Sequence, residues 1–261
     1  GPETVRYGGN TSCVEVRAED GTLLVLDAGT GIRALGERVN GSVSRIDLLL
    51  THMHMDHIQG LGFFKPLYEP GMDVHIWGPP SLSYDLRARL ARYLSPPLFP
   101  VSLRDLPSKP TLHNIVRSQF SIGPFEIESD LVCHPGPTLA YRIREGSRVL
   151  AYMPDHEPAL AAGLFPPDCS WMSGYRIAEG ADVLIHDAQY AGDEYEEHLG
   201  WGHSSLPQAF LFAGAARVKK LVTFHHDPAH DDAALDRLLA DVRSKCGVEM
   251  VPGTEGATFE V

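Results

Sequence analysis

A dense group of potential metal ligands occupies residues 51–57, which read THMHMDH and follow a short apolar run of strand length. In an extended segment, side chains two positions apart point the same way, so His52 and His54 can bind one metal ion. Asp56 and His57 follow where the chain turns into a helix, and they can face a second ion beside the first. The alternative is a polar loop whose histidines only form hydrogen bonds. Four ligand-type residues within six positions favour the metal site.

The types of ligand limit the choice of metal. Imidazole and carboxylate ligands without a thiolate fit zinc, with manganese and iron as alternatives. The cysteines lie far apart and form no CxxC pair: Cys13, Cys133, Cys169 and Cys246. This spacing argues against both a thiolate zinc site and a disulfide framework, and it suits a reducing compartment. We therefore expect a cytoplasmic location.

Charge and hydropathy exclude other classes of protein. The chain of 261 residues has 22 basic and 34 acidic side chains and a formal net charge of −12, which disfavours broad electrostatic binding of nucleic acid. A small phosphate substrate stays open, because bound cations reverse the local field. No apolar window approaches the roughly 18 residues of a membrane-spanning helix. The first residues lack the apolar stretch of a secretion signal, so we expect none in this sequence.

Strands and helices alternate along the chain and must position these ligands. Strands are predicted at residues 13–17, 22–27, 46–50, 74–77, 125–129, 139–143, 149–152, 183–186 and 221–224. Helices are predicted at residues 32–39, stopping near Asn40-Gly41, at 82–94, after Ser205-Leu206-Pro207, and at 232–245. The strands come in sets that look antiparallel. The prediction is an α/β fold in a single domain over residues 1–261, with the Pro-rich segment 65–112 as a cover over the site.

The order His-x-His-x-Asp-His after a buried strand resembles the first motif of the metallo-β-lactamase superfamily. Three later segments resemble further motifs of that superfamily in the expected order: Cys133-His134-Pro135-Gly136, Tyr152-Met153-Pro154-Asp155 and Phe224-His225-His226-Asp227. The resemblance extends over most of the chain. It implies the four-layer αββα sandwich of the superfamily, with the site at one edge of the paired sheets.

The resemblance also implies a set of ligands for two divalent ions. One ion takes His52, His54 and His134, the other takes Asp56, His57 and His225, and Asp155 is shared. His225 directly follows a strand, as the family's ligand does, so His226 is placed beside the site and not on the metal. Asp27 corresponds to an acidic residue that orients the histidines by hydrogen bonds. Capping the turn at Gly29 is a second role for Asp27, compatible with the first.

A proton donor is implied by the segment Gly200-Trp201-Gly202-His203-Ser204-Ser205, which resembles the Gly-His-Ser motif of the phosphodiesterase branch, that of ribonuclease Z and cyclic phosphodiesterases. The histidine of that motif protonates the leaving group, a role that falls on His203; capping the next helix is the alternative. Asp187 stands where those enzymes have glutamate, so its pairing with His203 is a hypothesis. Asp56 is assigned as a catalytic residue as well as a ligand. The expected nucleophile is a hydroxide bridging both metals, because metal binding lowers the pKa of water from about 15.7 to roughly 7.

The number of residues between the motifs of His134 and Asp155 limits the size of the expected substrate. His134 and Asp155 are 21 positions apart, which leaves no room for the long arm that grips tRNA in this branch. We therefore expect a small phosphodiester: a cyclic nucleotide, a cyclic phosphate or a short oligonucleotide. Hydrolysis of a lactone, thioester or β-lactam at the same two-metal centre is the alternative. A diiron redox or sensor module is a weaker one, because its second histidine is normally glutamate, here His54. The branch's relatives leave a homodimer open.

Several histidines lie outside this set. His75 and His113 belong to no motif and are expected at the surface or in satisfied core positions. His156, His198 and His230 lie near motifs, and we expect them in solvated loops.

Overall fold

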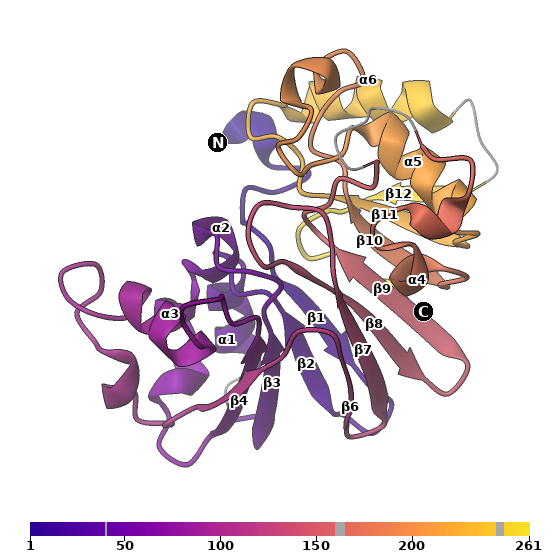
Figure 1. The fold of residues 1–261 in the computed structure, drawn as a ribbon. Coiled ribbons are helices and arrows are strands. Elements are labelled where there is room, and N and C mark those ends of the chain that lie inside the picture. The colour runs from indigo at the N-terminus through magenta and orange to yellow at the C-terminus, as the bar shows by residue number, and fades with distance from the viewer. Residues whose placement is uncertain (40, 160–164, 244–247) are drawn as a thin grey trace. The chain divides into compact units, whose positions relative to one another are not determined.

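The computed structural model describes residues 1–39, 41–159, 165–243 and 248–261. It divides into two compact units. The N-terminal unit comprises Asn10–Phe125, and the C-terminal unit comprises Glu126–Val261 together with Gly1–Gly9. Each unit has its own hydrophobic core between a β-sheet and helices (Figure 1). The single domain over residues 1–261 stays a prediction.

The sheet of the N-terminal unit has the strand order β1-β2-β3-β4-β5. Its strands are β1 (Val14–Arg17), β2 (Leu23–Leu26), β3 (Arg45–Leu49), β4 (Asp73–Gly78) and β5 (Thr111–Asn114). β1 pairs antiparallel with β2, and every later pair in this order is parallel. The helices of the unit are α1 (Ile32–Val39), α2 (Met55–Ile58) and α3 (Leu86–Tyr93).

Helices α1 and α3 pack against one face of this sheet. Because side chains alternate between the faces of a strand, every second residue can point to the helices. Leu48 of β3 and Ile76 of β4 do so, and they share a core with Leu35 of α1 and Leu90 of α3. Burial of each such side chain contributes about 1.5–3 kcal/mol. This packing fixes the strands that lead into the histidine segment.

The carboxyl ends of β2 and β3 lie at one edge of the sheet, because the two strands are parallel and Leu26 is in register with Leu49. Asp27 directly follows β2, and residues 51–57 begin two positions after β3. The topology therefore brings Asp27 and the histidines to the same edge.

The sheet of the C-terminal unit runs in the order β12-β11-β10-β9-β8-β7. The strands are β7 (Phe125–Leu131), β8 (Leu139–Glu145), β9 (Arg148–Met153), β10 (Val183–Asp187), β11 (Lys220–Phe224) and β12 (Glu249–Pro252), and β6 (Ser118–Ile122) precedes β7 along the chain. β7, β8 and β9 are antiparallel neighbours, whereas β9 to β12 are parallel.

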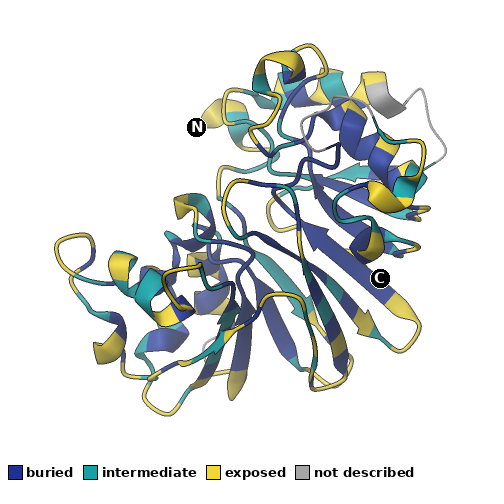
Figure 2. Cartoon of the chain, viewed as in Figure 1, coloured by how far each residue is buried: buried dark blue, intermediate teal, exposed yellow. Residues whose placement is uncertain are grey.

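Three helices of the C-terminal unit cover one face of its sheet: α4 (Tyr175–Ala178), α5 (Leu206–Ala215) and α6 (Asp232–Arg243). Phe212 of α5 and Leu239 of α6 pack in one core with Ala151 of β9 and Leu184 of β10, and these strands are dark blue, hence buried, in Figure 2. As predicted, α5 begins after Ser205, whose side chain accepts the N–H of Gln208. Across the described ranges, every helix is too short or too polar to span a bilayer.

The parallel part of this sheet also gathers polar residues at one edge. Asp187 is the last residue of β10, His225 directly follows β11, and Asp155 lies two positions after β9. Because these three strands are parallel neighbours, their carboxyl ends share an edge. Residues far apart in the sequence are therefore neighbours in this unit.

Some elements differ from the sequence prediction. The prediction that neighbouring strands are antiparallel is wrong for β2 to β5 and for β9 to β12, which are parallel. The helix predicted over 82–94 begins only at Leu86, because the Asp85 side chain caps it by accepting the N–H of Ala88 at 2.7 Å. Strands β5, β6 and β12 are missing from the prediction, since polar residues or proline make up half or more of each. The predicted helix ends at Asn40 and Lys245 lie outside the described residues.

The segment 65–112, predicted to cover the site, supplies β4, α3 and β5 of the N-terminal unit. Its side chains Leu67, Leu86 and Leu94 are fully buried in the core of that unit. The segment is thus part of the sheet and its helical layer, and its role as a cover stays a prediction.

Candidate metal centre

The histidine loop, residues 51–57 of the N-terminal unit, is held by the buried carboxylate of Asp27. Asp27 Oδ1 accepts the backbone N–H of Thr51 at 2.7 Å, and Oδ2 accepts the Thr51 hydroxyl at 2.9 Å. The same Oδ2 lies 2.9 Å from Nδ1 of His57. Because the hydroxyl of Thr51 donates to Asp27, it accepts from Nδ1 of His52, 3.0 Å away. Both imidazoles therefore use Nδ1 for hydrogen bonds and present Nε2 as the ligand atom.

The four potential ligands of the histidine loop lie together. The ring of His52 has its centroid 4.4 Å from that of His54 and 4.2 Å from that of His57. Asp56 Oδ2 lies 3.2 Å from Nε2 of His57. Donor atoms therefore converge within each of the predicted pairs, His52 with His54 and Asp56 with His57.

The backbone of the turn after β2, which includes Asp27, lies unusually close to the backbone around α2. Asp27 has a left-handed φ of 59°, which costs about 1–3 kcal/mol in a residue with a side chain. A Cβ on Gly60 would lie 2.0 Å from the carbonyl oxygen of Gly29, and one on Gly29 would lie 2.3 Å from the carbonyl oxygen of Asp56. Glycine at both positions lets the turn after β2 touch the helix that carries the histidines.

Replacing Gly60 by alanine should therefore destabilise the fold by about 1–3 kcal/mol, the usual cost of overpacking. Urea unfolding of the metal-free protein measures the change. Gly214→Ala in α5 is the matched control, because a Cβ there meets nothing within 4 Å, and it should stabilise by about 0.5 kcal/mol. A Gly60→Ala protein as stable as wild type would contradict the close contact.

A second prediction concerns Asp27 itself. Asp27→Asn keeps the shape but turns an NH₂ group toward one of the donors that the carboxylate accepts, so the imidazoles of the loop lose their fixed tautomers. We expect zinc affinity to fall about 10–100-fold, measured by competition with a chromogenic chelator. Asp20→Asn, which alters an exposed carboxylate that accepts the backbone N–H of Thr22 outside the loop, should leave the affinity unchanged. Equal affinities in both variants would exclude this role of Asp27.

In the C-terminal unit, Asp155 lies between two histidines. Its Oδ2 is 3.5 Å from Nε2 of His134, and its Oδ1 is 3.5 Å from Nε2 of His225. Two ligand atoms on one tetrahedral zinc, with bonds of 2.0–2.1 Å, lie about 3.3 Å apart. The spacing thus fits a carboxylate that shares one cation with His134 and another with His225. We refer to these three residues as the Asp155 cluster.

The two histidines of this cluster are fixed differently. His134 donates from Nδ1 to the carbonyl oxygen of Gly202 at 2.9 Å, which leaves Nε2 as its ligand atom. His225 has a left-handed φ of 57° directly after β11, and this turn directs its ring to Asp155. His226 points elsewhere: its Nδ1 donates to the carbonyl of Ala188 at 3.2 Å. Burial lowers the pKa of His226 to about 4, so its imidazole is neutral near pH 7.

His203 and Asp187 form a pair beside the Asp155 cluster. His203 donates from Nδ1 to Asp187 Oδ2 at 2.7 Å. The other carboxylate oxygen accepts the backbone N–H of Gln189 at 3.0 Å. The ring centroid of His203 is 4.8 Å from that of His134 and 5.2 Å from that of His225. Because Nδ1 is engaged with Asp187, Nε2 is the ring nitrogen of His203 that remains for other contacts beside these potential metal ligands.

The other histidines make contacts inside their own units. His156, expected in a solvated loop, is fully buried, and its Nδ1 lies 2.8 Å from Nε2 of the buried His186; that expectation is wrong, and burial lowers the pKa of both imidazoles. His230 contacts Glu194 at 3.0 Å, and His198 stacks on Tyr190.

On the sheet of the N-terminal unit, Nδ1 of His75 lies 2.8 Å from Nε2 of His113. The ring of His113 stacks on Trp77 with centroids 3.7 Å apart. These contacts agree with the expectation that both histidines are satisfied within the fold.

Sequence reasoning missed one buried acidic residue near the site. Glu157 is fully buried, and its carboxylate accepts backbone N–H groups of residues 43 and 45 positions later. Its only sequence signal is its place two positions after Asp155, because backbone amides leave no trace in side-chain spacing.

The histidine loop and the Asp155 cluster, the two clusters of potential ligands, have donor atoms that fit divalent metal ions. Each offers imidazole and carboxylate atoms, the ligands that zinc takes when thiolate is absent. The thiols of Cys13, Cys133 and Cys169 are free and belong to neither cluster. His52 and His57 in one unit and His134 in the other use their second nitrogen for a hydrogen bond, as in protein zinc sites.

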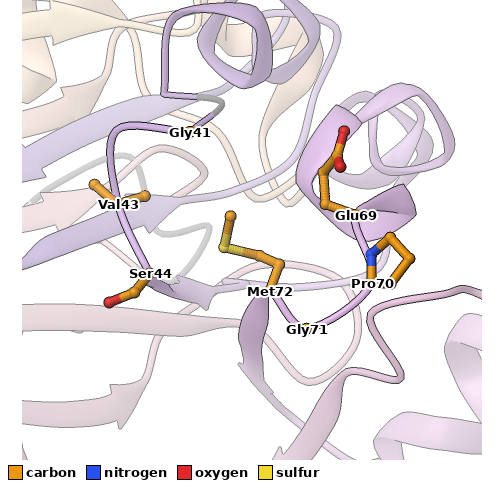
Figure 3. Close-up of a pocket in the computed structure, with 7 residues that line it drawn as sticks. All are labelled: Gly41, Val43, Ser44, Glu69, Pro70, Gly71 and Met72. Carbon is orange, nitrogen blue, oxygen red and sulfur yellow. The ribbon is translucent and has the colours of Figure 1, made fainter.

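A cavity of about 320 Å³ lies in the N-terminal unit between residues 41–44 and 69–72 (Figure 3). These loops precede β3 and β4, so the cavity is at the opposite strand ends from the histidine loop. Glu69 is the one titratable side chain among its lining residues. The cavity therefore lacks the chemistry of the two clusters.

Known proteins resemble the chain in both sequence and fold. Residues 22–226 match the beta-lactamase superfamily domain. Ribonuclease Z of Crocosphaera subtropica is 27% identical over 283 residues, covering 90% of this chain and 88% of that protein. The metallo-beta-lactamase fold protein YhfI of Bacillus subtilis, 20% identical, gives a TM-score of 0.70 over 98% of this chain and 96% of its own. A diphosphatase of the PhnP family, 18% identical, gives 0.66 over 96% and 84%. The chain belongs to the metallo-β-lactamase superfamily and has its α/β fold, with two mixed sheets flanked by helices.

Proposed function

We propose that the chain is a metal-dependent phosphodiesterase that hydrolyses small phosphodiesters. The superfamily includes hydrolases such as ribonuclease Z, one of which aligns with 90% of the chain. The family pattern assigns one pair of divalent cations, zinc before manganese or iron, to residues of both clusters: His52, His54, Asp56, His57, His134, Asp155 and His225.

One observation carries the choice of a phosphodiester: the hydrogen bond from His203 Nδ1 to Asp187 Oδ2. It engages Nδ1, so that Nε2 is the ring nitrogen through which the imidazolium form can donate a proton. An alkoxide that leaves phosphorus needs such a proton donor, since it is a strong base, and general acid catalysis typically contributes about 10²–10⁴-fold. The position beside His134 and His225 supports this role.

The charge of the site supports an anionic substrate. Two divalent cations would carry about +4 against about −2 from the carboxylates of Asp56 and Asp155. The balance is positive although the chain has a net charge of −12. A single phosphodiester anion is therefore attracted to the site, whereas a long polyanion is repelled by the rest of the surface.

Each group of the chain has a distinct task in this proposal. When bound, the cations would supply Lewis acidity and lower the pKa of water. The imidazoles and carboxylates of the histidine loop and the Asp155 cluster would hold them in place. Asp187 orients the ring of His203, and His203 delivers the proton from Nε2 to the leaving oxygen.

The experiment combines metal analysis with a panel of substrates. Metal content is measured by mass spectrometry on protein purified without chelator. Turnover is then compared for bis(p-nitrophenyl) phosphate, 2′,3′- and 3′,5′-cyclic AMP and a dinucleotide, against a lactone, a thioester and a cephalosporin. We expect two metals per chain and cleavage of at least one diester above the rates for the other three classes.

Two results would overturn the proposal. Fewer than two metals per chain with no cleavage of any diester would remove its basis. Faster cleavage of the lactone or thioester would transfer the same metal chemistry to an acyl substrate. Size-exclusion chromatography with light scattering, run on the same protein, tests the homodimer, which stays a prediction together with the cytoplasmic location.

A further inference from the structure

Glu157 is a buried carboxylate that touches neither cluster directly. Its Oε1 accepts the hydroxyl of Tyr195 at 2.8 Å and the backbone N–H of Gly200 at 3.0 Å. Its Oε2 accepts the backbone N–H of Gly202 at 2.9 Å. A buried carboxylate is costly without such donors, and hydrogen bonds to a charged group are stronger than those to a neutral one. Glu157 is thus held in place by one hydroxyl and the glycine loop, residues 200–202.

The glycine loop has the backbone conformation that its hydrogen bonds to Glu157 require. Gly200 and Gly202 have left-handed φ angles of 84° and 87°, a conformation that other residues adopt only with strain. A Cβ on Gly202 would lie 2.4 Å from Cδ of Pro135 and 2.7 Å from Nδ1 of His134. The loop therefore lies directly against the imidazole of His134.

One residue, Gly202, links Glu157 to two functional groups. Its N–H donates to Glu157, while its carbonyl accepts from Nδ1 of His134 at 2.9 Å. The next residue is His203, whose Nδ1 donates to Asp187. A change in the orientation of Gly202 would therefore move both the ring of His134 and the backbone of His203.

Tyr195 holds the carboxylate of Glu157 through a separate hydrogen bond. Burial, followed by its hydrogen bond to Glu157, raises the pKa of Tyr195. The phenol therefore stays protonated and remains a donor to Oε1. The glycine loop binds the same carboxylate through its own backbone N–H groups, independently of this hydroxyl. A variant without this hydroxyl therefore has a less stable buried carboxylate, while both hydrogen bonds that place the glycine loop are kept.

We propose that Glu157 is a positioning residue: by holding Gly202 it sets the tautomer and ring orientation of His134 and aligns His203 with Asp187. The part that concerns His134 needs only metal binding, whereas the part that concerns His203 rests on the proposed phosphodiesterase function.

The test uses Glu157→Gln and Tyr195→Phe in the full chain. The glutamine is isosteric, but either orientation of its amide places an NH₂ group against a backbone N–H of the glycine loop. Tyr195→Phe removes the hydroxyl and leaves both glycine contacts. Zinc affinity is measured by chelator competition, the visible absorption of the cobalt-substituted protein reports ligand geometry, and urea unfolding of the metal-free protein reports stability.

We expect Glu157→Gln to weaken zinc binding about 10–100-fold, the usual effect of removing a group that orients a ligand, and to change the cobalt spectrum. Tyr195→Phe should lower stability without either effect. Glu157→Asp, which keeps the charge, should restore part of the affinity. The proposal is overturned if Glu157→Gln binds zinc as wild type does, or if both variants lose affinity in proportion to their stability. If wild type binds two metals but cleaves no diester, the proposed function fails while the effect on His134 is still tested.

Discussion

Asp155→Asn is expected to lose at least one metal per chain and about 10³-fold or more in turnover. The carboxylate offers one oxygen to the neighbourhood of His134 and the other to that of His225, each at 3.5 Å. An amide keeps one acceptor and turns an NH₂ group toward the other imidazole, so it cannot serve two cations. Electrostatic stabilisation alone typically contributes about 10²–10³-fold, and the lowered pKa of water is lost with the metal. Metal analysis and turnover of the best diester measure the change.

A matched aspartate provides the control. Asp182 accepts the backbone N–H of Val149 at 2.8 Å and pairs with Lys219. Asp182→Asn removes the same charge from the same unit away from the Asp155 cluster, and it should keep both metals. Full metal content and normal turnover in Asp155→Asn would show that this carboxylate does not bridge.

His203→Ala should lower turnover by about 10²–10⁴-fold while leaving metal content intact. The effect should depend on the leaving group, because His203 supplies a proton that a phenolate does not need. We expect a large loss with a dinucleotide or cyclic nucleotide, whose leaving group is an alkoxide, and a small loss with bis(p-nitrophenyl) phosphate. Steady-state rates on both substrates, with the ratio of the two losses, measure this dependence.

Ser205 and not His203 caps α5, so the alternative that remains for His203 is that of a metal ligand, since ligand atoms of Asp187, His203 and His225 lie within 4.8 Å of one another. Loss of metal in His203→Ala would establish that role and contradict the general acid. An equal loss on both substrates would also count against proton donation. His230→Ala, which removes a histidine paired with Glu194, is the control and should affect neither substrate.

The sequence predicted those elements whose signals are local. Helix α1 has the predicted bounds, Ile32–Val39, because its apolar residues recur at helical spacing after a turn rich in glycine. The start of α3 was misplaced because Leu82, an apolar residue that suggested a helix, is fully exposed and Asp85 is the cap. Parallel pairing was missed because it depends on helices crossing between strands, not on the strands' own composition.

The candidate site was predictable to the extent that its residues directly follow strands. His52, Asp155 and His225 each come within three positions of a strand end, so spacing within the motifs locates them. Glu157 could not be found in this way, because it acts on backbone amides of a distant loop. The burial of His156 was also beyond local signals, since it depends on packing against α5 and β10.

The left-handed backbone of His225 has a consequence for attempts to make the protein more heat-resistant. Glycine relieves about 1–3 kcal/mol of conformational strain at such a position, so libraries selected for thermostability alone will enrich it there. Those variants will survive heating better and yet lack one of the proposed metal-binding imidazoles. Heat-resistant descendants of this protein should therefore be screened for metal uptake at every round, because selection by temperature alone favours variants that no longer bind metal.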